Sequence, residues 1–479
     1  MAEQIETHAD KAPVPPRILL IKSPQNDPSW KQIPHPLGLM YLASYLRKTY
    51  KYEIKIEDIR LYGNGSVDLE SVIRTFAPAV VGISALTHES DAVPRIAGCV
   101  KRVNASTPVL LGGPHATAYP EKAIRIPGID YLVVGEGEIA AGQLIERLLL
   151  QRDASDIKGI VYKKDDQIFS TGRADFIEDL NRLPMPAHDL ISINAYGNFT
   201  RASRAGTGRY MCLFSSRGCP FHCIYCHNIF GKLFRYRSAE NLFNEIKYCY
   251  DTHQIRDFEF MDDIFNLNRE RLIDFCDRII GSGMKVTFAF ANGLRGDLLD
   301  EQQLTKLRQA GTIYIAFAIE TGSPRLQKLI KKNIRLEKIK KNIEIARALR
   351  IHTHGFSMIG FPGETLEEMM MTVDFLVSSK LHTYGMFAVM PFENTELAEI
   401  VKKMGHLPVS DISMNYWSKK FINLTDVPSA KVNNIRRNTH LRFYLNPSRL
   451  YAIARDFPDK RALGKLCMLF FRRLWWRDQ

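Results

Sequence analysis

The 479-residue chain has little cysteine and no long hydrophobic run. Its eight cysteines are too sparse for a disulfide scaffold. No stretch of about 18 apolar residues predicts a transmembrane helix. The first 16 residues are polar and acidic with no apolar segment, so we expect no secretory signal. Apolar residues make up 45% and charged residues 24%, which excludes a disordered or fibrous protein. We therefore expect a cytoplasmic protein of two to three domains.

Acidic residues are the minority, with 52 Asp and Glu against 65 Lys and Arg and a net charge of +13. Most of the excess lies between Lys431 and Gln479, which carry 12 basic and 3 acidic residues. There, Lys465–Arg477 interleaves cations with large apolar side chains. This segment could lie peripherally at the inner membrane surface, or pack on the protein as a docking helix with solvated charges. No recognised RNA-binding module accompanies it, so we expect no nucleic acid partner.

Five short apolar, β-branched runs alternate with helical patterns after a polar tail at residues 1–16. We expect strands at Arg17–Ser23, Glu53–Ile59, Ala79–Leu86, Pro108–Gly112 and Asp130–Gly135, and helices at Leu37–Lys48, Asp91–Val103 and Ile139–Leu150. Near-continuous apolar strands separated by helices predict a parallel sheet covered on both faces. The sequence therefore predicts a doubly wound α/β domain over residues 17–150. Ligands of such domains bind at the carboxyl ends of the strands.

A second βα series follows a less regular stretch at residues 151–205, which contains a hairpin pattern (GIVYKKDDQIFSTG) and is expected to be a linker. Strands are expected at Tyr210–Ser215, Asp257–Met261, Lys285–Ala291, Ile313–Ile319, His354–Ile359 and Thr383–Val389. Helices are expected at Ala239–Asp251, Arg269–Ile280, Glu301–Ala310, Leu336–Leu349 and Leu366–Ser378. Six βα units predict a partial (β/α)6 TIM-like barrel over residues 206–410, with a helical region at 411–479. Functional groups should then follow the strands.

Three cysteines, Cys219, Cys223 and Cys226, crowd into eight residues directly after the first barrel strand. A [4Fe–4S] cluster normally takes four thiolates, so three would leave one iron open to a substrate. A structural Zn²⁺ with His222 or His227 as fourth ligand is an alternative. A second alternative is that the three cysteines are buried side chains that cluster by chance.

The pattern CxxxCxxC, with Tyr225 before its last cysteine, resembles the signature of radical S-adenosylmethionine (SAM) enzymes. Three later segments resemble that family's SAM-contacting elements: FMDDIF at Phe260–Phe265, ETGS at Glu320–Ser323 and GFSMIGFPGE at Gly355–Glu364. In the second, Thr321 replaces the usual Ser. The resemblance implies cluster ligation by the three cysteines and SAM contacts from Tyr225, Asp262, Asp263, Glu320, Ser323, Ser357 and Gly360.

Several of these residues also have simpler interpretations. Asp262 and Asp263 could cap the helix that starts near Asn268. Glu320 could pair with a neighbouring Lys or Arg. Gly360 could be a loop glycine with a positive φ.

The first domain resembles the cobalamin-binding domain of the B12-dependent radical SAM subfamily. Other B12 domains carry a DxHxxG loop whose His ligates cobalt, and here Asp58–Gly63 places Arg60 at that position. A guanidinium stays protonated and cannot ligate a metal, so Arg60 supplies no lower axial ligand to cobalt. The resemblance implies cobalamin contacts from Asp58, Arg60, Ser84, Gly112, Gly113, His115, Gly135 and Glu136. The alternatives are a degenerate, empty domain that binds a partner, and a structural role for His115.

The resemblance implies an enzyme that cleaves SAM reductively at a [4Fe–4S] cluster and modifies an unactivated carbon, first of all by cobalamin-dependent C-methylation. Cyclisation, rearrangement or oxidation of a lipid- or tetrapyrrole-like substrate is the alternative, because the layout also resembles the magnesium-porphyrin cyclases and hopanoid-lipid enzymes. A non-catalytic, zinc-stabilised binding protein is the second alternative. The expected partners are a small-molecule or lipid-like substrate and a reductant of the flavodoxin or ferredoxin type. Methylthiotransferases carry further N-terminal cluster cysteines, but only Cys99 precedes Cys212 here.

Overall fold

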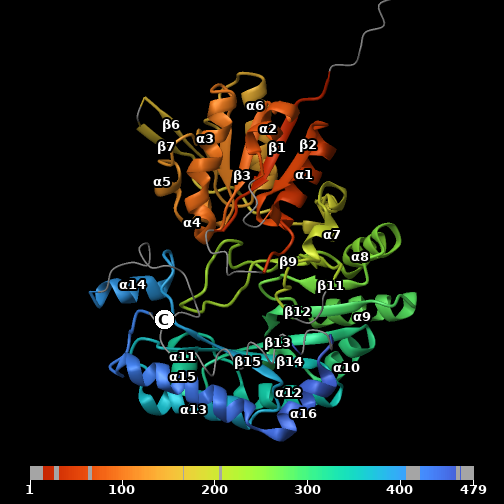
Figure 1. Ribbon diagram of the computed structural model, residues 1–479, viewed down its shortest axis with the longest axis vertical. Coiled ribbons are helices and arrows are strands. Elements are labelled where there is room, and N and C mark those ends of the chain that lie inside the picture. Colours follow the sequence, from red (N-terminus) through yellow and green to blue (C-terminus); the bar gives the residue numbers. More distant parts are fainter. Residues whose placement is uncertain are drawn as a thin grey trace, which may run out of the picture. The chain divides into compact units, whose positions relative to one another are not determined.

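The computed structural model describes residues 14–25, 32–62, 67–165, 167–203, 208–405, 421–459 and 464 (Figure 1). The chain forms two compact units, residues 1–26 with 38–174 and residues 27–37 with 175–479. The basic, aromatic segment Lys465–Arg477, and with it the predicted membrane contact, lies outside the described residues.

The first unit is built on a seven-stranded sheet in the order β2-β1-β3-β4-β5-β6-β7. The five predicted strands are confirmed as parallel neighbours: β1 Arg17–Lys22, β2 Glu53–Asp58, β3 Val80–Ser84, β4 Val109–Gly112 and β5 Tyr131–Val133. The predicted hairpin forms β6 (Ile160–Lys164) and β7 (Gln167–Ser170), which continue this sheet in antiparallel fashion. The stretch predicted as a linker from residue 151 thus contributes two strands to the first unit.

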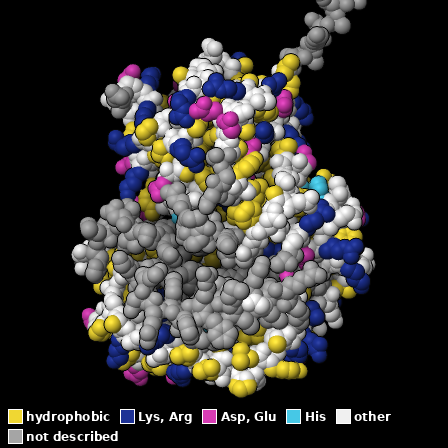
Figure 2. Space-filling view, viewed as in Figure 1, with side chains coloured by type: hydrophobic (Ala, Val, Ile, Leu, Met, Phe, Trp, Pro, Cys, Tyr) yellow, Lys and Arg dark blue, Asp and Glu magenta, His cyan; other side chains and the backbone are white. Residues whose placement is uncertain are grey.

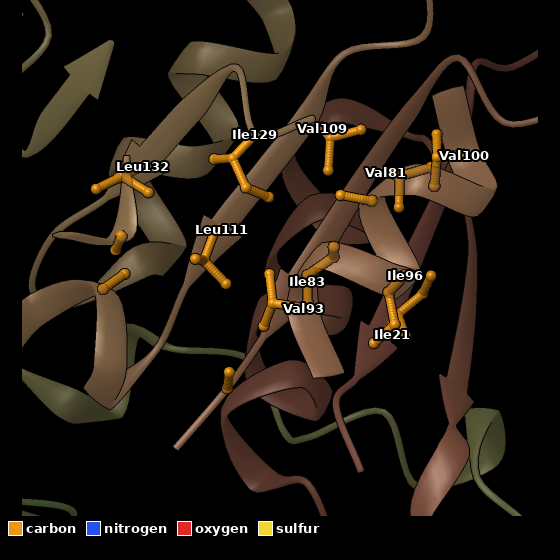
Figure 3. Close-up of a cluster of buried hydrophobic side chains, with 14 of the residues drawn as sticks. Ile21, Val81, Ile83, Val93, Ile96, Val100, Val109, Leu111, Ile129 and Leu132 are labelled. Atoms are coloured by element: carbon orange, nitrogen blue, oxygen red, sulfur yellow. The ribbon is translucent and has the colours of Figure 1, made fainter. Parts of the chain in front are cut away.

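Six helices accompany this sheet in the described part of the unit: α1 Leu37–Tyr50, α2 Leu69–Phe76, α3 Val93–Val103, α4 Pro114–Ala118, α5 Pro120–Ala123 and α6 Gly137–Leu149. Helix α2 was not predicted; it begins where the Asp68 carboxylate accepts the Ser71 N–H (3.0 Å). Figure 3 shows the apolar core, in which strand residues such as Val81 and Leu111 pack with Ile96 and Val100 of α3. The doubly wound interpretation is confirmed.

The second unit holds a six-stranded parallel sheet in the order β15-β14-β13-β12-β11-β8. Its strands are β8 Met211–Leu213, β11 Asp257–Phe260, β12 Thr287–Leu294, β13 Thr312–Glu320, β14 His352–Ile359 and β15 Thr383–Ala388. The helices between them are α8 Ala239–His253, α9 Arg269–Ser282, α10 Glu301–Gln309, α12 Leu336–Ala348 and α13 Leu366–Ser378. Strands β8 and β15 form the two ends of the sheet, as the predicted partial barrel requires.

Shorter elements and two C-terminal helices complete the second unit. They are α7 Ile193–Tyr196, β9 Ser216–Arg217, β10 Arg235–Tyr236, α11 Pro324–Leu329, α14 Glu396–Lys403, α15 Ser429–Tyr444 and α16 Pro447–Asp456. Helix α16 is held by the buried pair of Asp456 and His382 (3.1 Å). Figure 2 shows hydrophobic side chains at the surface where Figure 1 places α13 and α16. Leu450 and Tyr451 of α16 are exposed by 49% and 66%, and Leu445, just before α16, by 67%. None of the described helices is long and apolar enough to cross a membrane.

Candidate functional site

The three clustered cysteines lie on a loop framed by β9 and β10, which pair with each other. Gly218 opens the loop with φ +83°, and a Cβ there would lie 2.2 Å from the Leu233 carbonyl oxygen, so only glycine fits. The loop is bound to the rest of the unit through Ile224. Its N–H donates to the Ile330 carbonyl (3.1 Å), and its carbonyl accepts the Leu397 N–H (2.9 Å). The loop is therefore attached to α11 and α14.

The thiols of Cys219, Cys223 and Cys226 are free and half-buried. Burial, followed by the neighbouring charges of Cys223, Asp263 and Cys219, raises the pKa of Cys226 to about 12. The three thiols are therefore close enough to interact. Among the described residues, no three metal-ligating side chains are grouped closely enough to hold a single ion.

Two adjacent carboxylates follow β11, and they have different surroundings. Asp262 is buried and accepts hydrogen bonds from the Ser215 hydroxyl (2.7 Å) and the Ser216 hydroxyl (2.5 Å). Burial raises the pKa of Asp262, and the serine hydrogen bonds oppose that rise. Asp263 lies beside the cysteine loop, with its Oδ1 3.8 Å from His227 Nε2. Asp262 therefore fixes the chain that enters the loop, whereas Asp263 faces the loop itself.

The predicted capping role of these aspartates is wrong, because Asn268 caps α9. Its side chain accepts the Arg271 N–H (2.9 Å).

Glu320 ends β13 in a left-handed conformation, with φ +64°. This conformation costs a residue with a Cβ about 1 kcal/mol or more, and such strain concentrates at functional sites. Glu320 is 7% exposed and its carboxylate pairs with Lys332 (3.1 Å), so the interpretation as an ion-pair partner also holds.

Ser323 is fully engaged within the protein. Its oxygen accepts the Leu326 N–H at the start of α11 (3.2 Å), and its hydroxyl donates to Glu368 (2.8 Å).

Ser357 and Gly360 lie at the end of β14. The buried Ser357 hydroxyl donates to the Gly385 carbonyl (3.1 Å). Gly360 has φ +98°, and its N–H donates to Glu364 (2.6 Å). The Tyr225 ring lies 5.9 Å from that of Phe361, which connects the cysteine loop to this segment.

Glu364 had no predicted role. Burial raises its pKa to about 7, opposed by the N–H groups of Gly360 and Phe361.

Two cationic side chains beside the cysteine loop were not predicted from the sequence. The Arg295 guanidinium lies 3.6 Å from the centre of the Phe221 ring, and Lys332 pairs with Glu320. Neither residue belongs to a recognisable spacing, so no sequence pattern indicates their place beside the loop.

In the first unit, Asp58 and Arg60 form a buried, bidentate ion pair. Arg60 Nε and Nη2 donate to the two Asp58 carboxylate oxygens (2.8 and 2.6 Å), and Arg60 Nη1 lies 4.0 Å from Glu89. Lys22 pairs with Glu89 in turn. Burial lowers the pKa of Lys22 to about 8, and Glu89 opposes that shift. Arg60 is thus held inside a network of two cations and two anions at the carboxyl ends of β1 and β2.

The other predicted cobalamin contacts lie at the same edge of the sheet: Ser84 and Gly112 end β3 and β4, Gly113 and His115 follow β4, and Gly135 and Glu136 follow β5. Gly113 has φ +88°, and a Cβ there would lie 2.9 Å from the Ser84 hydroxyl. His115 is buried with no protein partner for its Nδ1. Burial lowers the pKa of His115, which favours the neutral imidazole. Glycine backbone and an unsatisfied buried nitrogen at one edge fit a large polar cofactor.

Comparison with known proteins gives the same two parts. The Radical SAM superfamily matches residues 213–376, and the B12 binding domain matches residues 29–145. An uncharacterized methyltransferase of Pyrococcus horikoshii is 30% identical over 449 residues, covering 91% of this chain and 94% of that protein. The cytidylyl-2-hydroxyethylphosphonate methyltransferase of Streptomyces wedmorensis is 29% identical, covering 76% and 77%. An anaerobic magnesium-protoporphyrin IX monomethyl ester cyclase of Rubrivivax gelatinosus is 26% identical, covering 70% and 60%.

The fold resembles that of the radical SAM methyltransferase TsrM from Kitasatospora setae, with a TM-score of 0.66 at 17% identity, covering 81% of this chain and 75% of TsrM. It also resembles the cobalamin-dependent radical SAM enzyme OxsB, with a TM-score of 0.66 at 18% identity, covering 82% and 55%.

These matches define a radical SAM barrel accompanied by a B12-binding domain. The chain belongs to the B12-dependent radical SAM enzymes. Its cofactors are a [4Fe–4S] cluster, SAM and cobalamin, and like other radical SAM enzymes it needs a reductant. The alternatives of a non-catalytic zinc protein and of an empty first domain are thereby ruled out.

Proposed function

We propose that the chain is a C-methyltransferase that transfers a methyl group from SAM to an unactivated carbon of a small-molecule or lipid-like substrate. The observation that carries this proposal is the match to the methyltransferase of Pyrococcus horikoshii, which spans 91% of this chain at 30% identity. Cyclases are also among the relatives, but the one from Rubrivivax gelatinosus shares 26% identity over 70% of the chain.

In this proposal the second unit binds the cluster and SAM. Cys219, Cys223 and Cys226 are the cluster ligands, and they leave one iron open for SAM. Asp263, Tyr225 and the backbone at Gly360 and Glu320 contact SAM. The buried side chains Asp262, Ser323 and Ser357 act indirectly, because their polar atoms already bind protein groups. When bound, the cluster and SAM supply a carbon radical, and cobalamin supplies the methyl carrier.

The first unit holds cobalamin at the carboxyl edge of its sheet. We assign this role to residues 17–150, with the hairpin to residue 174 as an extension of the same sheet. Ser84, Gly112, Gly113, Gly135 and Glu136 supply the surrounding backbone and side chains. Arg60 supplies no cobalt ligand, since its guanidinium is bound to Asp58.

A methyl label tests this function without knowledge of the substrate. The reduced holoenzyme is incubated with SAM whose S-methyl group is CD₃. The cobalamin is then extracted and its mass is measured by mass spectrometry. We expect the label on cobalamin, and a Cys223→Ala variant should no longer form 5′-deoxyadenosine. Cobalamin that stays unlabelled while wild-type enzyme cleaves SAM would favour cyclisation, rearrangement or oxidation, the function that the cyclase relatives support.

A further inference from the structure

The segment that follows α11, residues 330–333, runs along the cysteine loop. The Ile330 carbonyl accepts the Ile224 N–H (3.1 Å), and the Lys331 carbonyl lies 3.9 Å from the Cys223 sulfur as its hydrogen-bond acceptor. The backbone of this segment is fixed from its other side, because the Lys332 carbonyl accepts a hydrogen bond from Arg295 (2.9 Å). Lys332 is therefore held next to the loop by backbone contacts on both sides.

The Lys332 side chain is 12% exposed, and its ammonium lies 3.1 Å from a Glu320 carboxylate oxygen. Burial acts to lower the pKa of Lys332, but Glu320 and then Cys223 raise it above its ordinary value, so the ammonium stays charged. Lys332 directly follows Lys331, whose carbonyl accepts from the Cys223 sulfur, so a buried ammonium lies beside the cysteine loop.

We propose that the positive charge of Lys332 raises the reduction potential of the [4Fe–4S] cluster, and that the negative charge of Glu320 partly offsets this effect. The inference rests on the proposed ligation by the three cysteines. Reduction adds one electron from the reductant to the cluster, no bond forms or breaks, and the ammonium keeps its proton. A fixed positive charge in a poorly solvated site favours the state with the additional negative charge. Lys332 is a positioning residue in this account, because it acts through the cluster.

Two substitutions with opposite effects test the proposal. Lys332→Met removes the positive charge at nearly constant length and should lower the midpoint potential. Glu320→Gln removes the offsetting negative charge and should raise it. For each we expect a change of roughly tenfold in the equilibrium between reduced and oxidised cluster, about 59 mV for one electron. The potentials are measured by redox titration of the reconstituted full-length enzyme without SAM, followed by electron paramagnetic resonance.

Two lysine variants serve as controls. Lys332→Arg keeps the charge and should stay close to the wild-type potential. Lys328→Met removes an exposed ammonium from α11 and should leave the potential unchanged. Lys332→Met enzyme that holds its full iron and titrates at the wild-type potential would overturn the proposal.

If Lys332→Met fails to retain the cluster, Glu320→Gln decides: an unchanged or lowered potential would overturn the proposal. Failure of the underlying ligation is distinguishable, because Cys223→Ala enzyme would then keep its iron.

Discussion

At the scale of single residues, the two units use buried charge in different ways. In the first unit, Lys22, Asp58, Arg60 and Glu89 neutralise one another, and each is less than a tenth exposed. In the second unit, Lys332 and Glu320 form a pair beside three thiols. A buried charge is costly unless it is paired, so removing one member of such a set leaves the others unsatisfied.

Arg60→Met should therefore destabilise the first unit. Asp58 would lose both of its short hydrogen bonds from the guanidinium, and Glu89 would lose a cation at 4.0 Å. We expect a loss of about 3 kcal/mol in the free energy of unfolding, measured by urea denaturation. The double variant with Asp58→Asn should recover part of that loss.

The control is Arg74→Met, which removes an exposed guanidinium 3.3 Å from Glu70 and should cost less than about 1 kcal/mol. If Arg60→Met were no more destabilising than this control, the network would not support the unit.

At the scale of elements, Glu368 in the first turn of α13 connects that helix to the segment that follows β13. Its carboxylate accepts hydrogen bonds from Arg325 Nε (2.8 Å), from the Ser323 hydroxyl (2.8 Å) and from the Thr365 N–H (3.0 Å). The hydrogen bonds from Arg325 contribute most to a pKa of about 2. The segment that ends in Glu320–Ser323 thus depends on an ionised carboxylate of a neighbouring helix.

Glu368→Gln should destabilise the protein by about 1–2 kcal/mol at pH 7, a value discounted for solvent screening. Between about pH 4.5 and 2 the folded state binds fewer protons here than the unfolded state, so this contribution rises with pH. The difference between wild type and variant should be constant above about pH 4.5 and shrink as the pH falls toward 2. Urea denaturation across this range measures it.

Glu367→Gln, an exposed neighbour on the same helix, should show no such difference. A gap between Glu368→Gln and wild type that persists unchanged at low pH would contradict the role of the ionised carboxylate.

Strands and most helices could be predicted from the sequence, because their apolar periodicity follows directly from burial on one or both faces. The hairpin at β6 and β7 was recognised, but its pairing with β5 was not, since strand residues as far apart in the sequence as Leu132 and Val161 leave no local pattern. The cysteine loop could be predicted because Cys219, Cys223 and Cys226 lie close together in the sequence. Arg295 and Lys332 could not be predicted, because no periodicity connects them to their partners Phe221 and Glu320. Glu364 lies close to its partner Gly360 in the sequence, but no recognisable motif marks a carboxylate that binds this backbone.

At the scale of the whole molecule, the chain carries two compact units, the first with the candidate residues for cobalamin and the second with those for the cluster and SAM. The B12 binding domain matches within residues 29–145 and the Radical SAM superfamily within 213–376, so the two binding sites are largely encoded in separate stretches of sequence. Loss of one cofactor site should therefore leave the other cofactor bound. This independence makes the proposed cluster ligands testable in the full-length enzyme.

The most direct test is the iron, cobalt and zinc content of full-length enzyme purified without oxygen and with cobalamin supplied. We expect about four irons and about one cobalt per wild-type chain. Cys223→Ala should lose the iron and keep the cobalt, while Cys276→Ala, which removes a buried thiol of α9, should keep both. Zinc in place of iron in the wild type, or full iron in Cys223→Ala, would contradict the assignment of the cluster to these three cysteines.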